Sequence, residues 1–223
     1  MRLSLPSIVA RLAAGLLAAL FLAPAAAQAQ VLPMADARAL PLGTTVTVEG
    51  LVTVPSAIFS SGGSLDQGFA IEDGTGGIYV SIQTNFGFTL GQRVQATGQL
   101  ADSNGELILV PAGTSDVELL GHGRHVAPLR LSTGELGAAN EGLLVRIRGV
   151  ITGDFEFDPP FGVELFVDDG SGPARIFVNT STGIDLSGLA EGQLISLTGL
   201  SSTFETPEID PRFQHDILVE GRH

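Results

Sequence analysis

Apolar and polar side chains alternate along short segments of the chain, and glycine-containing turns separate these segments. In segment 44–54, Val46 and Val48 alternate with polar residues. A period of two predicts a strand that is buried on one side. Gly50 interrupts this strand and predicts a bend or a bulge. Long helical periodicity is missing, and segment 34–38 is expected to form one helical turn.

The same pattern predicts five strands in each half of the chain. In the first half we expect strands at 44–54, 68–72, 77–82, 92–101 and 106–110, and a closing segment at 116–120. In the second half we expect strands at 143–153, 163–168, 174–178, 193–201 and 208–210, and a closing segment at 216–219. Segment 155–161, with two prolines, is expected to be a loop.

The strand pattern also repeats within the chain. Segment 46–53 returns 99 positions later as segment 145–152, and Gly98 corresponds to Gly199, 101 positions away. A repeat of this kind predicts two similar units in tandem. Three meandering strands followed by a connection and two more strands are typical of an OB-type barrel. We therefore predict an all-β protein of two tandem OB-like five-stranded Greek-key barrels. The first barrel is expected at 31–121 and the second at 130–223, joined by a linker at 122–129.

Two stretches of the first unit resemble a known group of bacterial modules. Segment 38–50 reads RALPLGTTVTVEG and segment 69–80 reads FAIEDGTGGIYV. Both resemble the secreted OB-fold modules that are attached to extracellular nucleases and related enzymes. The second unit matches more loosely, with DGSG at 169–172 in the turn. The resemblance implies an OB fold and a ligand related to single-stranded nucleic acid. It does not imply an activity, because the catalytic domain of those proteins is absent here.

The N-terminal 30 residues have the pattern of a targeting segment. Arg2 and Arg11 flank a positive start, segment 12–22 is apolar, and the sequence Ala-Gln-Ala at 27–29 fits a cleavage site. This predicts a secretory signal peptide at 1–30 that is cleaved. An uncleaved anchor is the alternative, although the apolar run is short for a bilayer. We expect the mature protein to be periplasmic or secreted, and not bound to a membrane.

Composition limits the function classes that remain. The chain has no cysteine, which excludes disulfides and thiol catalysis. Its formal net charge is −13, and loss of residues 1–30 leaves nine arginines against 24 acids, or −15. Lysine is absent. Such a protein has no general attraction for nucleic acid or anionic lipid, so any contact with phosphate requires a local patch.

Groups typical of catalysis or metal binding are few. His122 and His125 are too few for a metal site, and a solvated linker is favoured. His215 and Asp216, near Glu208 and Asp210, could form an acid–base or metal cluster, but a polar strand edge and turn is favoured. The Asp-Gly turns at 73–74 and 169–170 favour hairpins, although a calcium ion at these turns stays an open alternative. We therefore expect no enzyme activity, no metal and no cofactor.

The outward positions of the second unit carry the candidate binding residues. If Val145 and Ile147 point inward, Arg146 and Arg148 point outward. On the next two strands the outward side chains are then Phe166, Arg175 and Phe177. Aromatic rings with nearby guanidinium groups are what OB barrels use to stack bases and contact phosphates.

The first unit keeps only part of this face. Tyr79 aligns with Phe177, but Thr47 and Glu49 stand where the second unit has arginines. The structural alternative is that the two phenylalanines pair across strands or pack against the other barrel. The arginines then pair with Glu164 and Asp168.

These patterns together predict a non-enzymatic, extracytoplasmic OB-fold binding protein. Its expected ligand is single-stranded nucleic acid or a similar extended polymer, bound by the outer face of the second unit. The alternative is a periplasmic protein-interaction or scaffold module with a protein partner and no nucleic acid.

Overall fold

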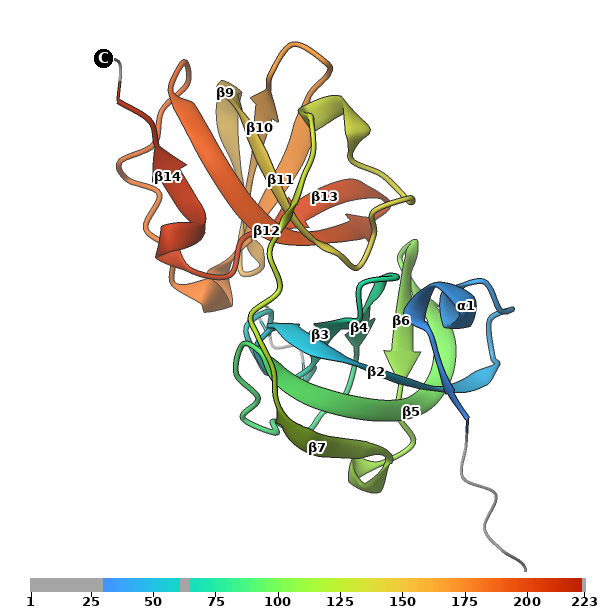
Figure 1. Cartoon of the computed structure of the whole chain (residues 1–223). Coiled ribbons are helices and arrows are strands. Elements are labelled where there is room, and N and C mark those ends of the chain that lie inside the picture. The colour runs from blue at the N-terminus through green and yellow to red at the C-terminus, as the bar shows by residue number, and fades with distance from the viewer. Residues whose placement is uncertain (1–29, 61–64, 222–223) are drawn as a thin grey trace, which may run out of the picture.

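The computed structural model describes residues 30–60 and 65–221. In this part of the chain two seven-stranded sheets curl into two barrels, one following the other in sequence (Figure 1). The predicted all-β class with two tandem OB-like barrels is confirmed. The predicted signal peptide, apart from residue 30, lies outside the described residues.

The first barrel closes through its long first strand. Its strands are β2 (Thr45–Val54), β3 (Phe69–Glu72), β4 (Gly77–Val80), β5 (Gln92–Ser103) and β6 (Glu106–Val110). Because β2 pairs with both β3 and β5, the order is β2–β3–β4–β6–β5–β2. Strands β4 and β6 run parallel. This closed order is that of an OB barrel. The peripheral elements are β1 (Val31–Leu32), α1 (Met34–Arg38), the 3-10 turn η1 (Thr114–Asp116) and β7 (Val117–His122).

The second barrel repeats the same topology. Its strands are β9 (Leu144–Asp158), β10 (Gly162–Asp168), β11 (Ala174–Asn179), β12 (Leu194–Phe204) and β13 (Thr206–Asp210). The order is β9–β10–β11–β13–β12–β9, and β11 and β13 run parallel. The peripheral elements are β8 (Leu129–Arg130), η2 (Thr133–Glu135), η3 (Thr180–Thr182), η4 (Gln214–Asp216) and β14 (Ile217–Val219).

The glycine predicted to bend the first strand has the same role in both barrels. At Gly50, β2 passes from pairing with β5 to pairing with β3, and a Cβ there would lie 2.9 Å from the backbone nitrogen of Glu72. At Gly149 in β9, a Cβ would lie 2.8 Å from the backbone of Asp168. Only glycine allows this close crossing of strands, so the repeat retains it in each unit.

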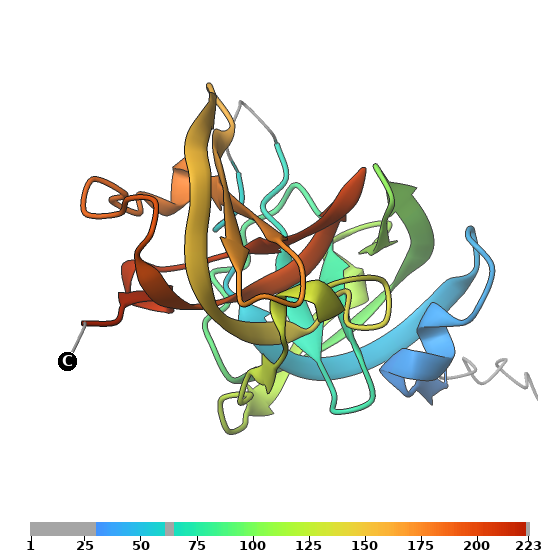
Figure 2. The ribbon, with the colours of Figure 1, turned by 90° about the horizontal axis from the view of Figure 1, so that it is seen from above.

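The second barrel differs from the prediction in its first hairpin. Segment 155–161 was expected to be a loop, but β9 continues to Asp158, and Phe157 pairs with Val163. Aromatic and acidic residues alternate along 155–158, as they do in a strand. The two prolines that indicated a loop lie just beyond the strand end, where a proline no longer breaks pairing. Figure 2 shows the long, strongly curved course of β9 from above.

Each barrel encloses its own apolar core. Val46 and Val48 are buried in the first barrel, and Val145 and Ile147 in the second, which confirms their predicted inward direction. The two cores share no residue. Burying one aliphatic side chain of this size contributes about 1.5–3 kcal/mol, so each barrel has a substantial driving force of its own.

A third apolar cluster joins the two barrels. Leu200 of β12 is 1% exposed and packs against the outer surface of the first barrel. The buried partners from the first barrel are Val54, Ala70, Tyr79 and Ile108. A leucine in this setting would be solvent-exposed if the barrels separated, so its burial favours the docked arrangement.

Polar contacts of Glu141 fix the orientation of the barrels. Glu141 lies just before β9 and is 8% exposed. Its Oε1 accepts hydrogen bonds from Arg38 Nη2 at 2.8 Å and from the backbone nitrogen of Leu107 at 3.2 Å. Its Oε2 accepts from Thr203 Oγ1 at 2.8 Å. The carboxylate is therefore satisfied by groups from both barrels, as a buried charge must be.

Two further contacts bring the backbones of the barrels together. A Cβ at Gly77 would lie 2.0 Å from the carbonyl oxygen of Gly142, so the barrels approach through two glycines. Arg212 is buried, forms an ion pair with Asp216 at 2.9 Å and donates from Nη1 to the carbonyl oxygen of Thr53 at 2.5 Å. No helix in the described ranges is long and apolar enough to cross a membrane.

Candidate ligand-binding site between the barrels

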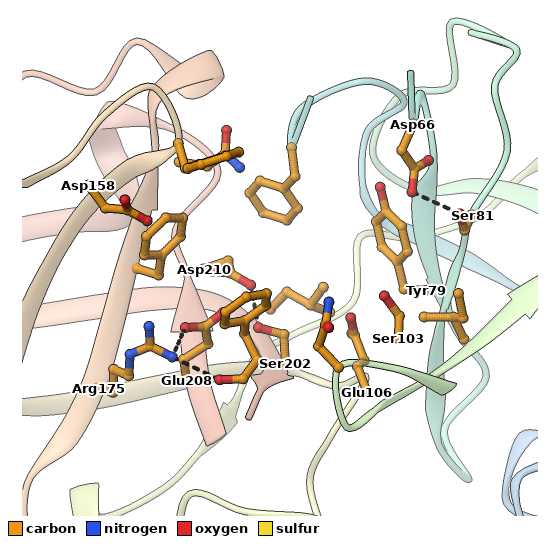
Figure 3. A pocket seen from close by; sticks show the side chains of 18 residues that line it. Asp66, Tyr79, Ser81, Ser103, Glu106, Asp158, Arg175, Ser202, Glu208 and Asp210 are labelled. Carbon is orange, nitrogen blue, oxygen red and sulfur yellow. Dashed lines mark hydrogen bonds and ion pairs between the residues drawn. The ribbon is translucent and has the colours of Figure 1, made fainter. Parts of the chain in front are cut away.

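A cavity of about 560 Å³ lies between the barrels, and both contribute its walls (Figure 3). We call it the inter-barrel cavity. The first barrel lines it with the β2–β3 connection, β4, the β5–β6 turn and β6. The second lines it with the end of β9, the β9–β10 turn, β11, β12 and β13. OB barrels bind ligands on the face of their second and third strands and on the loops after the first and fourth strands. Both barrels therefore turn part of this face toward one cavity: the third strand (β4 or β11) and the regions after the first and fourth strands.

Contacts between loops hold the two walls in place. The carbonyl oxygen of Asn104, in the β5–β6 turn, accepts a hydrogen bond from the nitrogen of Glu205, in the β12–β13 turn, at 2.7 Å. In the β2–β3 connection, the nitrogen of Ser60 donates to Ser181 Oγ at 3.0 Å. Ser181 Oγ itself donates to the carbonyl oxygen of Ile58 at 2.6 Å. The equivalent β5–β6 and β12–β13 turns thus meet beside the cavity, and the β2–β3 connection meets η3, which gives the cavity a defined width.

Aromatic rings form one part of the lining. They come from both barrels and are Phe59, Tyr79, Phe161, Phe177 and Phe204. Phe161 and Phe204 are 46% and 50% exposed, whereas Tyr79 is 9% exposed. Exposed rings at the edge of a cavity are available to pack against a ligand, and each buries a large area when covered.

Carboxyl groups form a second part of the lining. They are Asp66, Glu106, Asp158, Glu208 and Asp210. Among the described lining residues Arg175 is the basic one. If all these groups were ionised, the lining would carry a formal charge of −4 from five acids and one arginine. The cavity is therefore acidic as well as aromatic.

The guanidinium of Arg175 is already occupied by partners. Its Nε donates to Glu164, and its Nη1 lies 2.7 Å from Glu208 Oε2. Nη1 also donates to the carbonyl oxygen of Phe204 at 3.1 Å. Two carboxylates neutralise this one arginine, so it offers little net positive charge to an anionic ligand.

Among the described lining acids, Glu208 has a buried oxygen, Oε2, without a hydrogen bond, although it lies 2.7 Å from Arg175 Nη1. Glu106 has one without any partner in the described chain. Its Oε1 is buried and has no hydrogen-bond partner among residues 30–60 and 65–221. Burial raises the pKa of this carboxyl to about 8, and the charges of Glu141 and Glu208 add to the effect. Leaving a buried acceptor without a donor costs about 1–3 kcal/mol of stability, so a donor placed beside this oxygen would be favourable.

The opposite wall adds two more acids with raised pKa values. Burial raises the pKa of Asp210, and the charge of Glu106 raises it further, although Ser202 donates a hydrogen bond to it. Burial likewise raises the pKa of Glu208, with the charge of Asp210 as a second cause. Burial also raises the pKa of the Tyr79 hydroxyl, and the nearby Asp66 adds to this. Like charges from the two barrels therefore oppose each other across the cavity.

Asp66 has a structural role in the same wall. Its Oδ2 accepts from Ser81 Oγ at 2.8 Å, and its Oδ1 accepts from the nitrogens of Gly68 at 2.8 Å and Ile82 at 3.2 Å. These bonds tie the β2–β3 connection to the end of β4. The loop that carries Phe59 is thereby anchored beside the cavity.

The six predicted site residues are divided by the structure. Arg175, Phe177 and Tyr79 line the inter-barrel cavity. Phe166 lies opposite Arg175 on the neighbouring strand and is partly buried, but it does not line the cavity.

Arg146 and Arg148 lie on another part of the barrel surface. Pairing of β9 with β10 ends at Val150, so these two residues extend past the end of β10 and pair with β12 instead. Arg146 Nε donates to Thr198 Oγ1 at 2.8 Å, and Arg148 forms an ion pair with Glu220 at 2.7 Å. The expectation of one shared face is wrong, because the curvature of β9 turns its two halves in different directions.

The alignment of Tyr79 with Phe177 is also corrected. In the parallel ladders Tyr79 pairs with Ile108, and Arg175 pairs with Glu208. The Asp-Gly turns and these ladders equate Tyr79 with Arg175, two residues before Phe177. The prediction failed because alternation identifies the outward face of a strand but does not distinguish positions two residues apart.

The sequence missed Glu106, Glu208 and Asp210 as members of one site. Glu208 and Asp210 had been grouped with His215, but His215 is exposed and its ring stacks on Phe213 at 5.1 Å. The sequence did contain one indication of this site. Tyr79 and other apolar residues occupy outward strand positions, where polar residues in contact with solvent are expected. Such residues indicate a covered face, and the face of the other barrel is what covers it.

The Asp-Gly turns use their carboxylates within the fold. Asp73 accepts from the nitrogen of Thr75 through Oδ1 and from the nitrogen of Met34 through Oδ2, each at 2.8 Å. Asp169 accepts in the same way from Ser171 and Thr133. In the described part of the chain no group of three or more His, Asp or Glu side chains has the geometry to hold a metal ion.

No protein-family model and no curated protein sequence matches the chain. Several solved structures have a similar fold. A murine DNA-binding protein bound to double-stranded DNA is 15% identical, with a TM-score of 0.39, over 78% of this chain and 97% of that chain. Fission yeast Pot1 with single-stranded DNA is 8% identical, with a TM-score of 0.37, over 85% of this chain and 87% of that chain. An OBody bound to hen egg-white lysozyme is 16% identical, with a TM-score of 0.36, over 44% of this chain and 99% of that chain.

Proposed function

We propose that the protein is a non-enzymatic, extracytoplasmic binding protein that holds part of an extended polymer in the inter-barrel cavity. The observation that carries this proposal is that both barrels turn part of their OB ligand face toward the same cavity. These faces bind oligonucleotides and oligosaccharides in OB barrels. A composite site of this kind contacts the ligand from two sides, which a single barrel does not do.

The size and lining of the cavity support a binding role. Its volume of about 560 Å³ is within the range of about 300–1,000 Å³ that ligand pockets have. Phe161 and Phe204, both well exposed, stand beside it on the two turns of the second barrel. Flat groups of a polymer, such as bases or sugar rings, have suitable surfaces to pack against there.

Single-stranded nucleic acid is the first polymer to test. Its bases would stack on Phe177 and Phe161, each stacked base contributing about 1–3 kcal/mol. Its phosphates would have to remain outside the cavity, because Arg175 is paired with Glu164 and Glu208. We therefore expect weak binding in which stacking contributes more than charge, and a shallow dependence on salt.

The proposed location is supported by the signal peptide predicted at 1–30. The proposed lack of catalysis is supported by the roles of the carboxylates. Asp66, Glu164 and Asp216 are held in hydrogen bonds or ion pairs that stabilise the fold. A polymer-binding role requires no group beyond those that line the cavity.

The test is a fluorescence anisotropy titration with a labelled single-stranded oligonucleotide of mixed sequence, at low and at physiological salt. Phe177→Ala removes a ring from the cavity, and Phe157→Ala removes a ring of the same size that is 76% exposed and outside the lining. We expect affinity to fall about five- to a hundredfold in Phe177→Ala and to stay within twofold of wild type in Phe157→Ala.

Two results would contradict this assignment. If no binding occurs at low salt, single-stranded nucleic acid is not the ligand. If both variants lose affinity equally, the polymer binds outside the inter-barrel cavity. Circular dichroism of each variant shows whether the fold is retained.

A further inference from the structure

The inter-barrel cavity contains an acceptor that nothing in the described chain satisfies. Glu106 Oε1 is buried without a hydrogen-bond partner in the part of the chain that the structure describes. Most buried acceptors in proteins have a donor, so an acceptor without one is free to accept a hydrogen bond from water or from a ligand. A ligand that brings an N–H donor to this oxygen would remove the deficit.

Acids of the second barrel stand on the other wall of the same cavity. Asp210 is 8% exposed and Glu208 is 5% exposed, and Figure 3 shows them entering from the side opposite Glu106. Glu208 forms an ion pair with Arg175. Asp210 receives one hydrogen bond, from Ser202. Facing carboxylates repel each other unless a proton or a positive charge lies between them.

The aromatic rings of the cavity indicate, independently of the carboxylates, that the ligand carries a positive charge. Tyr79, Phe59 and Phe177 line the cavity from both barrels. The face of an aromatic ring attracts ammonium and guanidinium groups, with about 0.5–2 kcal/mol for each contact. Apolar lining is also present at Ile108 and Leu200, which suits an aliphatic stem. Carboxylates together with ring faces favour a cation over a neutral or anionic group.

We propose that the inter-barrel cavity binds an organic cation, an ammonium or guanidinium group on an aliphatic stem, with Glu106 as its main hydrogen-bond acceptor. This inference rests on the proposed function, an extended polymer held in this cavity, and within it favours a polymer that carries cationic groups over single-stranded nucleic acid. Glu208 is already paired with Arg175, so Glu106 and Asp210 are the acids deep in the cavity that are left for the ligand, since Asp158 is exposed and Asp66 anchors the β2–β3 connection. The cation has two possible sources, a free amine or the side chain of a basic peptide, and both have the same chemistry.

The position of Tyr79 allows a direct assay. It is the sole tyrosine of the chain, tryptophan is absent, and Tyr79 lines the cavity. Its intrinsic fluorescence therefore reports events at this site without a label. The free-amine probe is 1,5-diaminopentane, and 1,5-pentanediol is its uncharged counterpart of the same length. The peptide probes are Gly-Lys-Gly and its uncharged counterpart Gly-Gln-Gly.

We expect 1,5-diaminopentane, Gly-Lys-Gly or both to change the emission of Tyr79 saturably, and the uncharged counterparts to have no effect at the same concentration. The response to one amine probe or both identifies the source of the cation. In Glu106→Gln the affinity should fall at least about tenfold, because a bound cation favours the ionised carboxylate of Glu106, and glutamine of the same shape cannot ionise. The control Glu118→Gln, an exposed glutamate of β7, should bind like wild type.

The inference is overturned if neither amine probe binds, if the uncharged probes bind equally well, or if Glu106→Gln binds like wild type. Thermal unfolding of both variants shows that the fold is intact, and Asp210→Asn provides a second test from the other barrel. If the proposed function itself is wrong, these titrations give a different set of results. In that case the oligonucleotide, the amines and the uncharged probes all fail to bind at the cavity.

Discussion

Glu106 of β6 and Asp210 of β13 belong to different barrels, yet both line the inter-barrel cavity. The charge of Glu106 adds to the effect of burial in raising the pKa of Asp210. The docked arrangement therefore places two like-charged groups against each other. The apolar contacts of Leu200 and the bonds of Glu141 hold the barrels together against this repulsion.

This repulsion predicts an unusual dependence of stability on pH. The folded-state pKa of Glu106 is raised to about 8, and that of Asp210 is also raised. The folded protein thus binds more protons than the unfolded chain between about pH 5 and pH 8, so the free energy of unfolding falls as pH rises through this range. We expect a loss of a few kcal/mol, of the order that such shifts imply.

Urea unfolding followed by circular dichroism at several pH values measures this loss. In Glu106→Gln the decline between about pH 5 and pH 8 should be smaller, because one of the three acids with raised pKa values, Glu106, Glu208 and Asp210, no longer titrates. Glu118→Gln, an exposed control, should decline as wild type does. A wild-type protein whose stability is constant or rises across this range would contradict the arrangement.

The glycine contact between the barrels predicts a steric effect. In Gly77→Ala the new methyl group would lie 2.0 Å from the carbonyl oxygen of Gly142, which requires the barrels to move apart. We expect a loss of about 1–3 kcal/mol, typical of overpacking. Gly113→Ala is the control, because a Cβ there meets nothing within 4 Å. Equal stability of the two variants would show that the barrels do not meet at Gly77.

The buried ion pair of Arg212 predicts a large effect of a single substitution. Arg212 is 5% exposed, pairs with Asp216 and donates to the carbonyl of Thr53 in the other barrel. Arg212→Met leaves Asp216 as an uncompensated buried charge, which costs about 3–5 kcal/mol.

The exposed pair of Arg93 with Glu49 provides the matched control. Arg93→Met should cost less than about 1 kcal/mol, because solvent screens an exposed pair. Similar losses in Arg212→Met and Arg93→Met, measured by urea unfolding, would be inconsistent with a buried bridge between the barrels.

Much of the fold was predictable from the sequence for a local reason. Alternation of residues such as Val46 and Val48 identifies a strand and its buried face, and Gly50 and Gly149 mark the same bend in both units. These features depend on neighbours in sequence. The exact end of β9 was not predictable, because the prolines that follow Asp158 suggested a loop where the strand still continues.

The site was not predictable in the same way, because it depends on how two barrels dock. Arg175, Phe177 and Tyr79 were recognised as outward residues, and all three line the cavity. Nothing local in the sequence indicated that Glu106 would face Asp210. Their proximity follows from contacts such as that of Gly77 with Gly142, which are far apart along the chain.

If the inter-barrel cavity binds a cation as proposed, it must be accessible to small reagents and must favour positive charge. Because the chain has no cysteine, Ser103→Cys places a unique thiol in the cavity lining, and Ser115→Cys places one at an exposed control position of η1. The measurement compares the rates at which a trimethylammonium-ethyl and a sulfonato-ethyl methanethiosulfonate modify each thiol. We expect the ratio of cationic to anionic rates to be at least about tenfold higher at Ser103→Cys, since a difference of about 1.4 kcal/mol in electrostatic free energy suffices for that. Equal ratios at the two positions, or a Ser103→Cys thiol that neither reagent modifies, would contradict the proposal.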